Sequence, residues 1–219
     1  RMSHGAQLLP YNQSLYARLN QYIYSTIQRF TSIVEPSGYG KFYLDMTGME
    51  RIYKSHEQTG SNISKLVQDH VGLNPVLGIS QNKLVSRIST SVVPDTIHRI
   101  MAGDETQFLS PLDAPVIPSV HEPTVWKLIK FLILNQVRQI QALVNSATDT
   151  RRLFGRYALP LSQEVHGQDL SVVRPFVMKD HIVEQTVLTE DTNDTTILWS
   201  EVKRLSEQVA FKLRQRSQI

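Results

Sequence analysis

Hydrophobic spacing changes twice within the first fifty residues, and the change restricts how the chain can fold. Apolar side chains recur every three or four positions over residues 14–30, which predicts a helix with one buried face. Pro36, Gly38 and Gly40 interrupt that pattern. Apolar and polar side chains then alternate over residues 41–46, as they do in a strand with one buried face. A helix followed this closely by a strand favours a mixed fold in which helices pack against a sheet.

The same mixture of patterns continues to about residue 101. Hydrophobic spacing and chain-breaking residues predict four further elements: a helix over residues 63–71 that ends at Gly72, a short buried strand over 75–79, a helix over 82–92 capped by Ser80, and a strand over 96–101. This order predicts an α+β fold with an antiparallel sheet that carries helices on one side.

A group of prolines marks a predicted boundary after this layer. Proline breaks regular structure because it lacks a backbone N–H, and four prolines lie within residues 111–123. Helical patterns follow over residues 123–134 and 136–145, with shorter helical pieces to residue 167. We predict a strand over residues 178–189. A long amphipathic helix then carries five apolar residues on one face: Leu198, Val202, Leu205, Val209 and Leu213.

Composition excludes several classes of chemistry. The 219 residues contain no cysteine, which excludes disulfides, thiolate metal sites and cysteine nucleophiles. The seven histidines show no paired spacing of the kind that binds zinc. The longest apolar run, residues 128–134, contains Lys130 and is far shorter than the roughly 20 residues of a membrane-spanning helix. The net charge of +3 permits binding to nucleic acid without establishing it.

Basic residues gather in two places late in the chain. The first group is Arg151, Arg152 and Arg156, and the second is Lys203, Arg204, Lys212 and Arg214. One interpretation of each group is a solvated helix face. The other is a set of contacts to DNA phosphates, which fix the register of a complex without reading its sequence.

Two segments carry a resemblance to a known family. Residues 37–48, which include Tyr43, Leu44 and Asp45, and residues 78–89, which include Asn82 and Lys83, resemble signature segments of the Y-family (DinB/UmuC-type) translesion DNA polymerases. The resemblance covers almost the whole chain. It implies a partial palm over residues 1–110 without its first strand and fingers, a helical thumb with a helix-hairpin-helix over 111–172, and the start of an α/β little finger over 173–219, so that both ends are truncated.

The chain departs from the family where the chemistry occurs. The carboxylate pair that holds the metal ions in the family falls on Gly40 and Lys41, and a lysine that contacts the triphosphate falls on Val93. Two-metal transfer needs carboxylate ligands, and an ammonium group repels a divalent cation. Asp45 is expected to be structural, and Glu35 and Glu50 to be surface charges. We therefore predict no catalytic residue, no metal site and no cofactor. Magnesium is expected only if the chain is an active polymerase.

The thumb departs from the family as well. Ser119 and His121 replace the glycines of the family's hairpin turn. Glycine lets a backbone N–H approach a phosphate closely because no Cβ intervenes. The turn is therefore expected to bind phosphate poorly, to use His121 in another way, or to be a plain structural hairpin.

These features predict a non-catalytic, ImuB-like member of the family. The resemblance implies a DNA-binding adaptor in damage-induced (SOS) repair and translesion synthesis, located in the bacterial cytoplasm. Its implied partners are primer-template DNA, the sliding clamp, a recombinase filament and an active polymerase. The alternatives are a fragment of an active translesion polymerase and a general basic binding module. The residues predicted to contact DNA are Lys203, Arg204, Lys212, Arg214, Arg151, Arg152, Arg156, Lys83 and Arg87.

Overall fold

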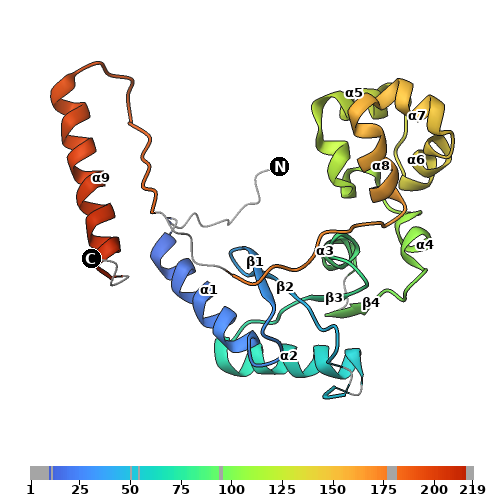
Figure 1. The fold of residues 1–219 in the computed structure, drawn as a ribbon, viewed down its shortest axis with the longest axis horizontal. Helices are drawn as coiled ribbons and strands as arrows, with labels where there is room; N and C mark the ends of the chain where they lie inside the picture. Colours follow the sequence, from blue (N-terminus) through green and yellow to red (C-terminus); the bar gives the residue numbers. More distant parts are fainter. Residues whose placement is uncertain are drawn as a thin grey trace, which may run out of the picture. The chain divides into compact units, whose positions relative to one another are not determined.

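The computed structural model describes residues 10, 12–49, 51–53, 55–93, 96–176 and 182–215. Within these ranges the chain mixes helices with short strands, and the predicted α+β class is confirmed (Figure 1). The chain forms two compact units, Arg1–Phe176 and Val177–Ile219. None of the described helices has the length and apolar character needed to cross a bilayer.

The first unit begins with a helix packed on a hairpin. Helix α1 (Gln13–Ile27) starts at Asn12, whose side chain accepts a hydrogen bond from the Leu15 N–H at 3.0 Å. Strands β1 (Val34–Gly38) and β2 (Lys41–Leu44) pair antiparallel. Helix α2 (His56–Val71) ends at Gly72 as predicted. The helices and the hairpin enclose a small core built from four buried residues, namely Ile27, Val34, Ile63 and Val67.

The second pair of strands departs from the prediction. Strand β3 (Leu77–Ile79) and strand β4 (Ile97–Arg99) pair parallel, whereas an antiparallel sheet was expected. The reason is helix α3 (Lys83–Val92) between them, because parallel strands need a crossover connection of this kind. Asn82 caps α3, accepting the Val85 N–H at 3.0 Å, so the prediction of Ser80 was wrong. The Ser80 hydroxyl instead donates to the carbonyl of Asn82.

Residues 105–165 are mainly helical, as predicted, and they share a core with α3. The elements are α4 (Glu105–Leu109), the 3-10 turns η1 (Ala114–Val116) and η2 (Pro118–His121), α5 (Pro123–Phe131), α6 (Val137–Val144), α7 (Ala147–Phe154), η3 (Gly155–Tyr157) and α8 (Ala158–Val165). One continuous cluster of buried apolar side chains runs from Leu84 and Val85 in α3 to Val165 in α8. The proline-containing turns therefore contribute Ala114, Ile117 and Val120 to this core, and the predicted boundary at residue 111 stays a prediction.

The second unit consists mainly of helix α9 (Thr195–Gln215), which matches the predicted amphipathic helix. None of its residues is buried. Residues 182–189 form no strand, so this part of the strand prediction was wrong, and residues 178–181 lie outside the described residues. A strand requires a paired neighbour, and no described segment pairs with residues 182–189.

Candidate nucleic-acid interface

Gly40 and Lys41, the two positions that the resemblance aligns with the family's carboxylate pair, lie on the β1–β2 hairpin (Figure 1). Gly40 occupies the turn with φ of +69°, a conformation that glycine adopts without strain. Its N–H donates to Asn20 Oδ1 of α1 at 2.8 Å. Lys41 is the first residue of β2 and is exposed, whereas Phe42 and Leu44 pack against the small core. The hairpin thus presents a glycine and an ammonium group to solvent.

The carboxylates near this hairpin are already engaged. Asp45 Oδ1 accepts the Thr47 N–H at 2.9 Å, and the Asp45 N–H donates to the Ile33 carbonyl at 3.0 Å. Asp45 therefore holds the end of the hairpin, in agreement with its expected structural role. Within the described ranges, no three His, Cys, Asp or Glu side chains converge on a possible metal position.

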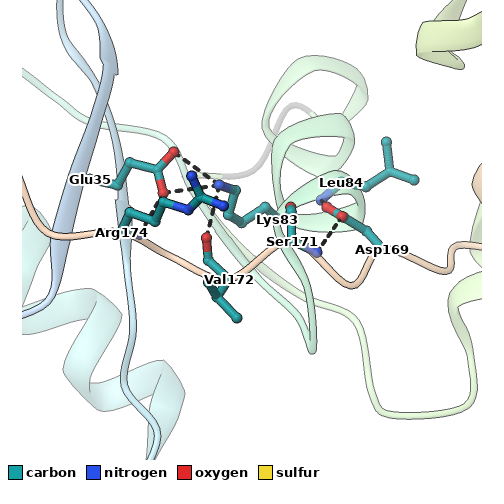
Figure 2. Close-up of polar contacts among 7 residues, drawn as sticks. All are labelled: Glu35, Lys83, Leu84, Asp169, Ser171, Val172 and Arg174. Carbon is teal, nitrogen blue, oxygen red and sulfur yellow. Dashed lines mark hydrogen bonds and ion pairs between the residues drawn. The ribbon is translucent and has the colours of Figure 1, made fainter.

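Glu35 is not the surface charge that the sequence predicted. It lies on β1 opposite Tyr43, and its two oxygens each lie 2.9 Å from Lys83 Nζ (Figure 2). The Arg174 N–H donates to Glu35 Oε2 at 2.7 Å. Lys83 Nζ also donates to the Val172 carbonyl at 3.2 Å and lies 5.1 Å from the centre of the Tyr43 ring. Spacing alone gave no signal for this cluster, because its members come from three distant segments.

The Glu35 cluster ties a late segment of the chain to the hairpin. Partial burial raises the pKa of Glu35, but the Arg174 N–H and the Lys83 ammonium outweigh it and hold the pKa below the usual 4.5. Glu35 is therefore ionised at neutral pH, and its oxygens are shared between Lys83 and a backbone amide. Such a carboxylate would have to give up these partners to bind a metal ion.

We expect the stabilising effect of Glu35 to depend on pH. A carboxyl group whose pKa is lowered by folding stabilises the folded state above its unfolded pKa, and this contribution is lost as the pH falls. Urea denaturation of the unmodified chain and of Glu35→Gln should therefore give free energies of unfolding that differ at pH 7 and converge below about pH 4.5. A difference that stays constant from pH 7 to pH 3 would contradict this assignment.

A second cluster joins α3 to the end of the helical region. Asp169 Oδ2 accepts the Leu84 N–H at 3.1 Å and Oδ1 accepts the Ser171 N–H at 2.9 Å (Figure 2). The Asn82 side chain donates to the Gly167 carbonyl at 2.7 Å. A groove of about 820 Å³ lies beside these contacts, and its lining includes Arg87 of α3, Gln163 of α8 and His166 at the end of α8.

The other predicted positions on α3 and at its end lie in different surroundings and make different contacts. Arg87 is exposed, and its side chain borders the groove. Lys83 points into the Glu35 cluster. Val93 is the half-buried C-cap of α3, and its N–H donates to the Ser89 carbonyl at 3.1 Å. The Glu50 and Pro94 positions lie outside the described residues.

The helical region carries the first basic group on its surface. Arg151 and Arg152 are exposed in the last turn of α7. Arg156 donates to the Tyr157 hydroxyl at 2.6 Å, and its guanidinium lies 4.8 Å from the centre of that ring. The Ser119 N–H in η2 donates to Glu164 Oε2 at 2.7 Å. The Ser119 N–H, which would have to donate to a bound phosphate, thus already donates to the Glu164 carboxylate. The helix-hairpin-helix stays a prediction.

The second basic group lies on α9, and only part of it is free of internal partners. Arg204 pairs with Glu201 at 2.7 Å, and Lys212 pairs with Glu184. No ion pair to Lys203 or Arg214 is found among residues 182–215. These two cations are eleven residues apart, which places them on one face of the helix about 16 Å apart along its axis.

Known proteins are similar to this chain in sequence and in fold. Residues 1–91 match the model of the impB/mucB/samB family. The DNA polymerase IV of Dehalococcoides mccartyi is 30% identical over 206 residues, which cover 94% of this chain and 52% of that protein. The DNA polymerase IV of Desulfatibacillum aliphaticivorans is 26% identical over 209 residues and gives the same two coverages.

Solved structures show the same fold. DinB from Sulfolobus solfataricus matches this chain with a TM-score of 0.62 at 17% identity, and the matched region covers 76% of this chain and 49% of DinB. The post-insertion binary complex of Dbh DNA polymerase has a TM-score of 0.63 at 17% identity and covers 93% of this chain and 60% of that chain. The fold is that of a polymerase palm with its thumb. The chain is thus similar in sequence and in fold to Y-family DNA polymerases of the DinB type, as the resemblance implied, and it spans about half the length of the curated relatives it matches.

Proposed function

We propose that the chain is a DNA-binding adaptor in translesion synthesis that does not itself join nucleotides. The observation that supports this proposal is the hairpin, whose Gly40 and Lys41 are the residues that the resemblance aligns with the metal-binding carboxylates. The neighbouring carboxylate of Glu35 is held by Lys83 and by the Arg174 N–H. Two-metal catalysis needs several carboxylate oxygens directed at the ions.

The proposed organisation and partners follow the family. We propose a palm over residues 1–110, a thumb over 111–172 and the start of a little finger over 173–219. The proposed location is the bacterial cytoplasm, and the proposed partners are primer-template DNA, the sliding clamp, a recombinase filament and an active polymerase. The DNA contacts we favour come from cations without internal ion pairs in the described ranges: Arg87, Arg151, Arg152, Arg156, Lys203 and Arg214. Lys83, Arg204 and Lys212 come second because each has an acidic partner.

One observation favours a second candidate, an active translesion polymerase. Relatives that align with 94% of this chain are named DNA polymerase IV. The two candidates differ in what magnesium and nucleotides do. A polymerase extends an annealed primer, whereas the adaptor only binds it.

We expect no primer extension with magnesium and all four nucleotides, even after long incubation. The double variant Gly40→Asp, Lys41→Glu should also be inactive, because Val93 replaces the lysine that contacts the triphosphate in the family. A DNA polymerase IV relative with its own carboxylates serves as the positive control. Extension by the unmodified chain would establish the polymerase and reject the adaptor.

DNA binding is tested separately by its dependence on salt. If about four phosphates are contacted, the affinity for primer-template DNA should fall about 100-fold between 50 and 200 mM salt. Fluorescence anisotropy with a labelled primer-template measures this slope. The variant Lys203→Gln, Arg214→Gln should reduce the magnitude of the salt slope by about 1.8, which corresponds to two lost phosphate contacts. Glu207→Gln on the same helix should not reduce it. Absent or salt-insensitive binding at 50 mM would favour a general binding module.

A further inference from the structure

The tip of the β1–β2 hairpin presents an aromatic side chain to solvent. Residues 37–41 are all exposed, and Tyr39 keeps half of its surface accessible. Gly38 and Gly40 flank Tyr39, and apart from chain neighbours no described residue has an atom within 4 Å of the place where a Cβ would stand on either glycine. A flat ligand can therefore approach the tip without meeting neighbouring side chains at these two positions.

The tip is held in place by helix α1. The rings of Tyr39 and Tyr16 lie 6.3 Å apart between centres and are tilted by 48°. The hydrogen bond from the Gly40 N–H to Asn20 fixes the turn a short distance away. An aromatic ring that is already positioned loses little conformational freedom when a ligand stacks on it.

The charge around the tip suits an anion. Lys41 is exposed, and the described residues give it no ion pair. No acidic residue precedes Glu35 in the sequence, and Glu35 itself is paired with Lys83. A cation beside an exposed aromatic ring is the combination that binds single-stranded nucleic acid, because bases stack on the ring and phosphates pair with the cation.

We propose that Tyr39 and Lys41 bind an unpaired nucleotide of a primer-template, with the base on the Tyr39 ring and a phosphate at Lys41. This inference rests on the proposed DNA-binding function and assigns the hairpin a role in it. The hairpin tip then binds the single-stranded part of the DNA, since it offers one exposed ring for a base and one exposed cation for a phosphate. A protein segment docking on the same ring is the competing outcome.

The test compares two DNA molecules with the same duplex, one blunt and one with a single-stranded overhang. Anisotropy at 50 mM salt is measured for the full chain, Tyr39→Ala, Tyr39→Phe and Lys41→Gln. We expect Tyr39→Ala to weaken binding to the overhang DNA by about 5- to 100-fold and to leave blunt-duplex binding unchanged. Tyr39→Phe keeps the ring and should bind overhang DNA as the unmodified chain does. Lys41→Gln should lower the salt slope on overhang DNA by about 0.7.

Each failure has its own result. If the unmodified chain binds neither DNA, the proposed function fails before any variant is compared. If it binds both and Tyr39→Ala equals it on overhang DNA, the nucleotide site is rejected while the DNA-binding function stands. Equal losses on both DNA molecules also reject the site. Thermal unfolding of each variant guards against misfolding, and Lys41→Gln provides an independent readout on an exposed side chain.

Discussion

Replacement of Gly78 by alanine is expected to lower the free energy of unfolding by about 3 kcal/mol. Gly78 lies in β3 and faces Ser86 and Ser89 of α3. A Cβ there would stand 2.1 Å from Ser89 Oγ and 2.3 Å from the Ser86 carbonyl oxygen. Ser89 is completely buried, and the Ser86 hydroxyl donates to the Gly78 carbonyl at 2.7 Å. The added methyl group must push the strand and the helix apart because one obstacle is backbone.

Urea denaturation followed by circular dichroism measures this loss. Gly60→Ala is the matched control, since the three atoms nearest to its Cβ would be side-chain atoms of Ile97 and Ile79 at 3.2 to 3.6 Å. Alanine is also favoured over glycine inside a helix by up to about 1 kcal/mol, so Gly60→Ala should be close to neutral or stabilising. Removal of the Ser89 hydroxyl should not rescue Gly78→Ala, because the Ser86 carbonyl remains. Equal midpoints for Gly78→Ala and Gly60→Ala would contradict the close packing of β3 on α3.

Replacement of Lys83 by methionine is expected to lower the free energy of unfolding by about 1–3 kcal/mol. The change removes the cation between Glu35, the Val172 carbonyl and the Tyr43 ring. It leaves a half-buried carboxylate whose remaining hydrogen bond comes from the Arg174 N–H. Removing one partner of such a pair destabilises more than removing both, because a buried charge is left unpaired.

A double-mutant cycle with Glu35→Gln separates the pair from its surroundings. Glu35→Gln should be less harmful in the Lys83→Met background than in the unmodified chain. DNA binding gives the second readout, with Arg87→Gln as the control on the same helix. We expect Arg87→Gln to reduce the salt slope by about 0.9 and Lys83→Met to change it little. Unchanged stability of Lys83→Met together with a reduced slope would make Lys83 a phosphate ligand instead.

Local patterns predicted the elements well where one side of an element is buried. The helices beginning at Gln13 and ending at Gly72 follow from apolar spacing and a glycine stop. The cap of α3 was misplaced by two residues, since Ser80 and Asn82 are both good capping residues and only the backbone path decides between them. The parallel pairing of β3 and β4 depends on the path of the crossover helix, which spacing does not show.

The site was less predictable because its contacts join distant segments. The resemblance aligned Gly40 and Lys41 with the metal-binding pair, and strand β1 before them was not predicted. Nothing in the sequence linked Glu35 to Lys83, which lies 48 positions away. The Arg204 to Glu201 pair is a three-residue helical spacing that the sequence could have revealed. The Lys212 to Glu184 pair joins α9 to an irregular segment, and no pattern points to it.

The continuous core from α3 to α8 determines how the first unit can be handled in the laboratory. Leu84, Val85 and Ile88 lie on α3 and pack with apolar residues of the helical region from α4 to α8. An expression boundary at residue 110 would strip this helix of its apolar neighbours and invite aggregation. The whole first unit should therefore melt in one cooperative transition, and a shortened version of the protein is better ended after Phe176.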